Sequence, residues 1–446
     1  MQGGSRMKRF IESQLEQWKE SPRRKPLILR GLRQVGKTWS VKAFGNKCFE
    51  QTAIIDLERN PAWRAVFEGA LNARRICADL EILTGQKIQP GKTLLFIDEI
   101  QSSPRAIAAL RYFYEEMPDL HVIAAGSLLE FALKDVSVPV GRIQFLQIYP
   151  LCFAEYLEAI GNAEAAAVVL ATPGPLSQTV HDYLITELRK YFFVGGMPES
   201  VQAYVDTGSL RESFDVHKEL IETYRMDFAK YAPHADKLCL NSVFTTLSRN
   251  VGRQIKYARL AEGYSNPTLK KAFELLCLAG VVRKIPSVNP AGLPLGASAS
   301  PGIFKVIMAD IGLMQSLSGI SVELEYTRND LLQVYRGAMA EQFVGQEMLI
   351  SQKGALYYWD RPGKSSMAEV DFLAVIDGIV HPVEVKSGAS GSLKSLQLYL
   401  DSYANSGKAM VFSIRPFAKL PDTKITFLPL YFAMSATENQ GKSAPV

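Results

Sequence analysis

The sequence of 446 residues has few of the residues that build metal or disulfide frameworks. Its cysteines are scattered, and no two of them have the CxxC spacing typical of zinc and redox motifs. The five histidines are isolated from one another. We therefore expect no zinc site and no disulfide framework, and each cysteine is most simply a reduced core residue. The five cysteines are Cys48, Cys77, Cys152, Cys239 and Cys277.

Long apolar runs and a strong net charge are also missing. No apolar run approaches the ~20 residues that a membrane span requires, and the first residues show no apolar signal-peptide region. We therefore expect a cytoplasmic protein with no membrane partner. The formal net charge of +5 permits a nucleic-acid partner without indicating one. The hydrophobic share of 47% is ordinary for a globular protein large enough for two to four domains.

A complete P-loop follows a short apolar strand at 26–30 and precedes a helical pattern. In this setting, backbone N–H groups surround a polyphosphate and the start of the helix adds a favourable dipole. Lys37 can reach the β- and γ-phosphates, and the Thr38 hydroxyl can bind Mg²⁺. A chance glycine-rich turn is the alternative. The expected nucleotide-binding residues are Gly31, Leu32, Arg33, Gln34, Val35, Gly36, Lys37, Thr38 and Trp39.

Two acids, Asp98 and Glu99, lie near the end of a buried strand expected at 93–100. Asp98 is in the place of a Walker B aspartate that holds Mg²⁺, and Glu99 is placed to activate the attacking water as a general base. The alternative is a pair of solvated acids at the end of a strand. A P-loop upstream and the apolar residues before the acids favour the catalytic interpretation.

Two further residues are candidates to assist catalysis. Ser127 follows the strand at 121–125, where it can orient water or contact the γ-phosphate, or cap a helix that begins at Leu128. Arg142 opens the expected strand at 142–148 and can serve as an arginine finger that reaches a nucleotide on a neighbouring subunit. A salt-bridged surface arginine is the equal alternative for Arg142.

The pattern of the first third of the chain predicts an α/β fold. Apolar strands are expected at 26–30, 53–57, 93–100, 121–125 and 142–148, and helical patterns lie at 7–19, 61–84 and 106–116. Nearly continuous apolar strands separated by helices indicate a parallel sheet that is covered on both faces. Residues 151–230 are expected to be helical.

These motifs resemble those of prokaryotic AAA+ ATPases of the archaeal-ATPase-like group. The resemblance rests on the P-loop, on Leu95-Phe96-Ile97-Asp98-Glu99-Ile100-Gln101, on Ala125-Gly126-Ser127-Leu128, on Gly141-Arg142, on 149–156 and on Phe193-Val194-Gly195-Gly196-Met197-Pro198, a segment similar to the lid signature of that group. It implies a helical lid, a winged-helix-like segment and a carboxy-terminal domain of unknown function related to restriction-endonuclease-like folds.

The carboxy-terminal third contains acids in a nuclease-like order. Glu341 lies on an expected helix, 335–350, and Asp371 and Glu384 lie on expected neighbouring strands, 369–376 and 379–386. Asp371 and Glu384 could bind a divalent cation, and Lys386 could orient or activate water. This spacing is similar to the PD-(D/E)xK nuclease core, with Ser387-Gly388 and a helix at 393–400 as its last elements. The alternative is a retained scaffold that binds DNA or protein, with its charges in a buried ion network.

The middle segment has a pattern typical of a winged helix. Helices are expected at 257–261 and 269–278, followed by a β wing from Gly280 to Ile285. Lys270, Lys271, Arg283 and Lys284 could contact phosphates. A protein-interaction module, with lysines that merely solvate a helix face, is as good an interpretation.

Together these patterns predict four domains: a P-loop AAA+ core at 7–160, a helical lid at 161–236, a winged-helix-like module and linker at 237–330, and a nuclease-like α/β domain at 331–434. The predicted activity is Mg²⁺-dependent ATP hydrolysis, with homo-oligomers if Arg142 is a finger. Two roles remain open for the rest of the chain. One is a nucleotide-gated nuclease, and the other is a nucleotide-dependent switch or scaffold for DNA or protein that cuts nothing.

Overall fold

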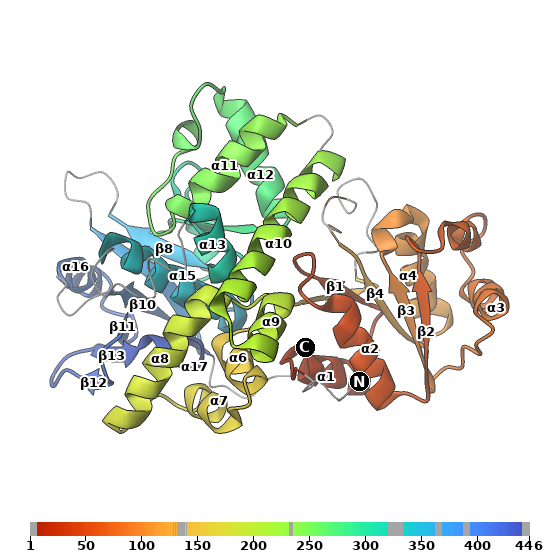
Figure 1. The fold of residues 1–446 in the computed structure, drawn as a ribbon, viewed down its shortest axis with the longest axis horizontal. Helices are drawn as coiled ribbons and strands as arrows, with labels where there is room; N and C mark the ends of the chain where they lie inside the picture. Colours follow the sequence, from red (N-terminus) through yellow and green to blue (C-terminus); the bar gives the residue numbers. More distant parts are fainter. Residues whose placement is uncertain are drawn as a thin grey trace. The chain divides into compact units, whose positions relative to one another are not determined.

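A computed structural model describes residues 7–127, 129, 131, 139, 141–231, 235–319, 333–361, 368–386 and 393–438 (Figure 1). The chain divides into two units. The first consists of Met7–Pro150 with Leu278–Gly280, and the second contains Leu151–Cys277 and, from Val281 onward, the rest of the described chain. Within the described ranges, no helix has both the length and the apolar character needed to cross a membrane.

The first unit contains a five-stranded sheet in the order β2-β3-β4-β1-β5, and every neighbouring pair is parallel. Its strands are β1 (Leu27–Arg30), β2 (Gln51–Asp56), β3 (Thr93–Asp98), β4 (His121–Ala125) and β5 (Gln144–Gln147). Because parallel strands end at the same edge, the segments that follow β1, β3 and β4 meet there. β4 lies between β1, which leads into the P-loop, and β3, which ends at the acids. Ser127 follows β4 and therefore lies between the two.

Helices cover both faces of this sheet, as the sequence predicted. Side chains of α3 (Ala73–Thr84) and α4 (Pro104–Glu116) share a core with Ile28, Ile97 and Ala124. On the other face α2 (Lys37–Cys48) packs on β2, β3 and β4, and α1 (Ile11–Glu20) packs on α2. Two short 3-10 segments complete the unit, η1 (Pro61–Phe67) and η2 (Ile100–Ser102).

Three predicted elements in this unit had wrong boundaries. The strand expected at 93–100 ends at Asp98, because Glu99 has a φ of 51° and turns the chain there. The helical pattern at 61–84 is divided into η1 and α3, because the chain turns between them at Gly69, whose φ is 75°. The fifth strand begins at Gln144 rather than at Arg142. Gly141 has a φ of 76°, and the Arg142 amide donates to the Pro139 carbonyl oxygen, so Arg142 lies in a turn before the strand.

The second unit begins with helices, as predicted for 151–230. They are α6 (Phe153–Ala159), α7 (Ala163–Leu170), α8 (Gln178–Val194), α9 (Pro198–Thr207) and α10 (Leu210–Tyr231). Between α8 and α9, the backbone of Gly196 approaches Leu151 so closely that a Cβ at Gly196 would collide with the Leu151 backbone. Gly196 of the lid-like signature therefore permits a close crossing of two chain segments.

The middle of this unit combines short helices with a strand pair. Its elements are α11 (Lys237–Arg249), η3 (Tyr257–Arg259), α12 (Asn266–Leu278), β6 (Val282–Pro286), η4 (Leu295–Ser298), β7 (Phe304–Met308) and α13 (Ile311–Ser318). β6 and β7 are antiparallel. The helix expected at 257–261 is only the three-residue 3-10 turn η3, so that prediction was wrong in length.

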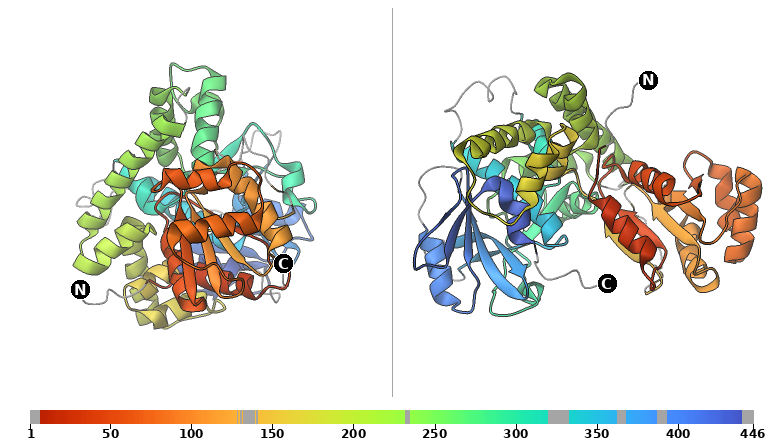
Figure 2. Two further views of the ribbon diagram at one scale, coloured as in Figure 1. Left: turned by 90° about the vertical axis from the view of Figure 1, so that its right-hand side faces the viewer. Right: turned by 90° about the horizontal axis from the view of Figure 1, so that it is seen from below.

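The carboxy-terminal part forms a mixed six-stranded sheet in the order β12-β13-β11-β10-β9-β8 (Figure 2). β8, β9 and β10 are antiparallel neighbours, whereas β10, β11 and β13 run parallel. Leu396 and Tyr399 of α16 pack on one face of the sheet. The elements are α15 (Gln333–Ser351), β8 (Tyr357–Asp360), β9 (Glu369–Ile376), β10 (Ile379–Val385), α16 (Lys394–Ser402), β11 (Ala409–Ser413), β12 (Ala418–Lys419), β13 (Ile425–Pro429), η5 (Leu430–Phe432) and α17 (Ala433–Thr437).

Helix α15 joins the parts of the second unit through buried polar side chains. Gln342 accepts from the Met308 amide and donates to the Met308 carbonyl oxygen, both at 2.8 Å. Gln346 accepts from the Ile311 amide at 3.0 Å. Because these side chains satisfy backbone groups of β7 and α13, α15 fixes the middle of the unit against the carboxy-terminal sheet.

Candidate functional site

The P-loop between β1 and α2 has the backbone conformation that its glycines permit. Gly31 has a φ of 150°, and a Cβ at this position would lie 2.5 Å from the carbonyl oxygen of Ile148. Gly36, directly before α2, has a φ of 93° in the left-handed region. Gly31 therefore allows the loop to pass the end of β5 closely, and Gly36 turns the chain into a helix whose free N–H groups can bind an anion.

Lys37 is folded back onto its own loop. Its Nζ donates to the carbonyl oxygens of Gly31 at 3.0 Å and Leu32 at 2.9 Å. Burial lowers the pKa of Lys37 to about 8, although the nearby carboxylates of Glu99 and Asp98 act in the opposite direction. A buried ammonium held only by carbonyl oxygens is thus available for a stronger, anionic partner.

Arg9 supports the loop from a distant part of the sequence. Its side chain is buried, and its guanidinium donates to the carbonyl oxygens of Val35 at 3.2 Å and Tyr149 at 2.7 Å. The arginine therefore ties the P-loop to the end of the segment that follows β5. Sequence reasoning missed this residue, because an arginine before an amphipathic helix has no distinctive pattern.

Thr38 and Asp98 are joined directly. The Thr38 hydroxyl donates to Asp98 Oδ2 at 2.8 Å, and the Glu99 amide donates to Asp98 Oδ1 at 3.1 Å. Burial raises the pKa of Asp98 above its ordinary value. The two residues predicted to share a cation therefore lie side by side, with hydroxyl and carboxylate oxygens that suit a hard cation such as Mg²⁺.

Glu99 is fixed by the segment after β4. Its Oε2 accepts from the backbone amide of Ser127 at 3.1 Å, from the Ser127 hydroxyl at 2.9 Å and from Gln101 Nε2. Gly126 leaves room for the Gln101 side chain, because a Cβ at Gly126 would collide with the Gln101 amide oxygen. The structure thus brings Glu99 and Ser127 together and adds Gln101. The helix predicted to begin at Leu128 lies outside the described residues.

Two other predicted residues lie on the surface. Arg142 Nε is 2.9 Å from Glu115 Oε1, and both side chains are substantially exposed. Trp39 on α2 is 43% exposed. The contact that Arg142 makes is the surface ion pair that the sequence left open as an alternative to the finger.

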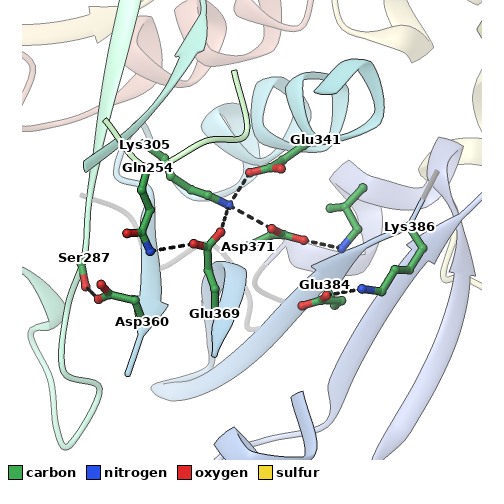
Figure 3. Close-up of polar contacts among 10 residues, drawn as sticks. Gln254, Ser287, Lys305, Glu341, Asp360, Glu369, Asp371, Glu384 and Lys386 are labelled. Carbon is green, nitrogen blue, oxygen red and sulfur yellow. Dashed lines mark hydrogen bonds and ion pairs between the residues drawn. The ribbon is translucent and has the colours of Figure 1, made fainter. Parts of the chain in front are cut away.

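The nuclease-like acids meet a lysine that the sequence analysis did not single out (Figure 3). Lys305 Nζ of β7 lies 2.6 Å from Glu341 Oε1, 2.5 Å from Glu369 Oε1 and 2.9 Å from Asp371 Oδ1. Burial by itself would lower the pKa of Lys305, but Asp371, Glu341 and Glu369 hold it well above its ordinary value. Glu341 and Asp371 are therefore close together, as predicted, but an ammonium lies between them.

Glu384 and Lys386 lie beside this cluster. Lys386 Nζ is 2.5 Å from Glu384 Oε1. Burial, reinforced by the neighbouring charge of Asp371, raises the pKa of Glu384 to about 8, and burial likewise raises the pKa of Glu341 to about 8. The predicted Ser387-Gly388 segment lies outside the described residues. Across the part of the chain that the structure describes, no group of three or more histidine, cysteine or acidic residues is placed to hold a metal ion.

The basic residues of the middle segment contact different partners. Lys284 Nζ donates to the Tyr257 hydroxyl at 3.1 Å and lies 4.7 Å from the centre of the Phe304 ring. Lys270 is 3.9 Å from Glu274 in an exposed pair. These contacts leave phosphate binding by Lys270, Lys271, Arg283 and Lys284 as a prediction.

Three family models match separate parts of the chain. The model described as "AAA domain" matches residues 23–157, and two models described as "Domain of unknown function" match residues 185–324 (DUF8612) and 336–431 (DUF4143). No functionally curated protein matches the sequence significantly.

Solved structures with similar folds are distant. The Aeropyrum pernix ORC1 protein in complex with DNA is 13% identical, with 71% of this chain and 94% of that chain covered and a TM-score of 0.30. Drosophila ORC bound to DNA is 11% identical, with 70% and 94% covered and a TM-score of 0.29. The Thermotoga maritima RuvB Holliday junction branch migration motor is 17% identical, with 62% and 89% covered and a TM-score of 0.28.

Structures with such low identities and TM-scores do not indicate what this chain binds. The assignment of its first unit therefore rests on the family match and on the geometry of the unit itself. Residues 23–157 contain the P-loop, the contact between Thr38 and the buried Asp98, and the contact between Glu99 and Ser127 in the segment after β4. The first unit of this chain is therefore an AAA domain with a parallel α/β core, followed in sequence by two segments that match families without an assigned function.

Proposed function

We propose that the AAA domain binds ATP with Mg²⁺ and hydrolyses it. The observation that carries this proposal is the contact between the Thr38 hydroxyl and Asp98 Oδ2 at 2.8 Å, directly beside Glu99. This contact supports the proposal because it joins the threonine of the P-loop to the last residue of β3, with Glu99 next in sequence. In this proposal the amides of the loop and Lys37 bind the β- and γ-phosphates.

The two protein oxygens suit Mg²⁺ better than Ca²⁺, which usually takes more protein ligands. Mg²⁺ keeps several waters and takes one or two protein oxygens together with phosphate oxygens, so the pair Thr38 and Asp98 is sufficient. When bound, Mg²⁺ would neutralise negative charge that develops on the phosphates. Trp39, next to Thr38 and partly exposed, is proposed to border the nucleotide.

Glu99 is the proposed general base. Its Oε2 is held by Ser127 and Gln101, and its other oxygen has no hydrogen bond among the described residues. Glu99 would accept a proton from the attacking water at that other oxygen, while Ser127 and Gln101 keep the carboxylate in position. Lys37 would exchange its two carbonyl contacts for phosphate oxygens.

The direct test is the replacement of Lys37 by alanine. We expect Lys37→Ala to abolish ATP hydrolysis, because the loop loses the only ammonium buried within it. Lys42→Ala is a matched control, since Lys42 is exposed on the same helix α2. Normal turnover by Lys37→Ala would refute the proposed site.

Arg142 is proposed as an arginine finger that reaches a nucleotide bound by a second copy of the chain. The support is its exposure and its position in the turn before β5. We expect Arg142→Ala to lower turnover per subunit. Glu115→Gln, which removes the surface carboxylate that pairs with Arg142 and Arg111, should leave turnover unchanged. Equal activity of Arg142→Ala and the wild type at every protein concentration would leave Arg142 as a surface ion pair.

For the carboxy-terminal part we propose a module that binds DNA or a protein partner under control of the nucleotide state and cuts nothing. The ammonium of Lys305 between Glu341 and Asp371 favours this role over a nuclease. We expect no cleavage of linear, circular or single-stranded DNA with Mg²⁺ or Mn²⁺, and ATP-dependent shifts in DNA mobility. Cleavage that is lost in Glu384→Ala or Lys386→Ala would establish the nuclease instead.

A further inference from the structure

Lys305 is a charged residue in the middle of an otherwise apolar strand. β7 has the sequence Phe-Lys-Val-Ile-Met, and all five residues are buried. The Lys305 side chain is 1% exposed, so its ammonium has no access to water as a partner. A lysine is retained in such a place only if carboxylates compensate its charge.

The compensation comes from two elements of the carboxy-terminal part. Glu341 comes from α15, and Glu369 and Asp371 come from β9, with distances of 2.6, 2.5 and 2.9 Å to Nζ. The three carboxylates converge on Nζ in Figure 3. Because an ammonium has three protons, each proton can be directed to one carboxylate, and Nζ has no capacity left for another acceptor.

We propose that Lys305 is a built-in cation, which takes the place that a divalent metal ion would need among Glu341, Glu369 and Asp371 and thereby closes this acidic cluster to metal. A metal ion at this position would compete with Nζ for the oxygens of Glu341, Glu369 and Asp371, and the ammonium would repel it at such short range. The second oxygen of Asp371 accepts from the Val385 amide at 2.9 Å and is also engaged.

The same arrangement links two parts of the chain. Lys305 belongs to the segment 185–324, and its three partners belong to the segment 336–431. The buried charge of Lys305 is therefore compensated only when β7 lies against α15 and β9. In the inferred role, Lys305 orders the strand pair β6-β7 on the carboxy-terminal sheet instead of supporting metal chemistry.

A latent site is left if Lys305 is removed. Glu384 is 7% exposed, and its Oε2 has no hydrogen-bond partner in the described part of the chain. It lies next to Asp371 (Figure 3). Without the ammonium, the carboxylates around the vacated position would offer oxygen ligands of the kind that Mn²⁺ and Mg²⁺ accept.

The test counts Mn²⁺ bound by the full chain without nucleotide, by electron paramagnetic resonance. All variants carry Asp98→Asn, which removes the acid of the AAA domain from the count. We expect the Lys305→Ala protein to bind one more Mn²⁺ than the Lys305 protein, and Lys305→Arg to bind no more, because arginine keeps the cation. We also expect added Mn²⁺ to raise the unfolding temperature of Lys305→Ala only, since binding to the folded state stabilises it.

Two results would overturn the proposal. One is a Mn²⁺ ion bound with Lys305 in place and lost in Asp371→Asn, a comparison that does not require a folded Lys305 variant. The other is a folded Lys305→Ala protein that binds no additional Mn²⁺ and has an unfolding temperature independent of the metal. If Lys305→Ala folds only when Mn²⁺ is present, the metal has replaced the ammonium as proposed.

Discussion

The hydroxyl of Thr38 and the carboxylate of Asp98 are separated by sixty residues in sequence and by 2.8 Å in the AAA domain. Asp98 contacts the P-loop, whereas its neighbour Glu99 contacts Ser127. Adjacent acids are thus directed to different partners, since Glu99 has a φ of 51° in the left-handed region and turns the chain after β3. This division fits the proposed roles of Asp98 in cation binding and of Glu99 in proton transfer.

Replacement of Glu99 by glutamine separates binding from hydrolysis. The amide keeps nearly the same shape but cannot accept a proton from water. We expect turnover to fall by about 10²- to 10⁴-fold, the range typical of a general base. Affinity for ATP, measured by calorimetry, should change less than about threefold. A Glu99→Gln protein with ordinary turnover would remove Glu99 from the mechanism.

If Gln101 positions Glu99 as proposed, its effect should appear in turnover alone. Its Nε2 contacts both Glu99 Oε2 and, at 3.4 Å, the Ser127 hydroxyl. We expect Gln101→Leu to lower kcat by about tenfold with KM for ATP unchanged, because the base loses one of its three hydrogen bonds. Ser102→Ala, one residue further on, is the control and should leave both constants unchanged. A rise in KM without a fall in kcat would contradict this role.

The central part of the AAA site could be predicted because its signals are local. Asp98 ends an apolar strand, and the P-loop, Glu99 and Ser127 each follow one; parallel strands bring such positions to one edge of the sheet. The turn at Gly141 was missed, since an apolar pattern does not show where strand pairing begins. Gln101 could have been suspected from its place two residues after the base.

Residues that act through long-range contacts could not be found in this way. Arg9 binds carbonyl oxygens of Val35 and Tyr149, and carbonyl groups have no signature in the sequence. Lys305 did leave a signal, because it is a lone charge in an apolar strand. Its partners Glu341 and Asp371, however, lie 36 and 66 residues away on other elements. The D…ExK spacing was therefore recognised while the ammonium among the acids was not.

Gln342 should contribute strongly to the stability of the second unit. It is fully buried, and both polar atoms of its side chain bond to the backbone of Met308. We expect Gln342→Leu to lower the free energy of unfolding by about 2–4 kcal/mol, because two buried backbone groups lose their partner. The exposed Gln397→Leu should change it by less than about 0.5 kcal/mol. Urea denaturation measures both, and equal stabilities would contradict the assigned contacts.

His121 at the start of β4 is a buried, neutral imidazole in the AAA domain. It is 6% exposed, and its ring meets Trp18 and Phe49 edge to face, with ring centres 5.8 and 4.9 Å away. Burial lowers its pKa to about 4, and the nearby charge of Arg24 acts in the same direction. The unfolded chain, with an ordinary histidine pKa near 6.5, therefore takes up a proton before the folded domain does.

The free energy of unfolding should consequently fall with pH in the window between about 6.5 and 4. Above pH 6.5 the imidazole is neutral in both states and the contribution of His121 is complete. At pH 5 we expect a loss of about 1–2 kcal/mol from this residue. His121→Phe keeps an aromatic ring but cannot be protonated, so it should lose less stability than the wild type between pH 7 and pH 5. The carboxyl groups common to both proteins cancel in this difference, and parallel pH profiles in thermal unfolding would show that His121 does not titrate as described.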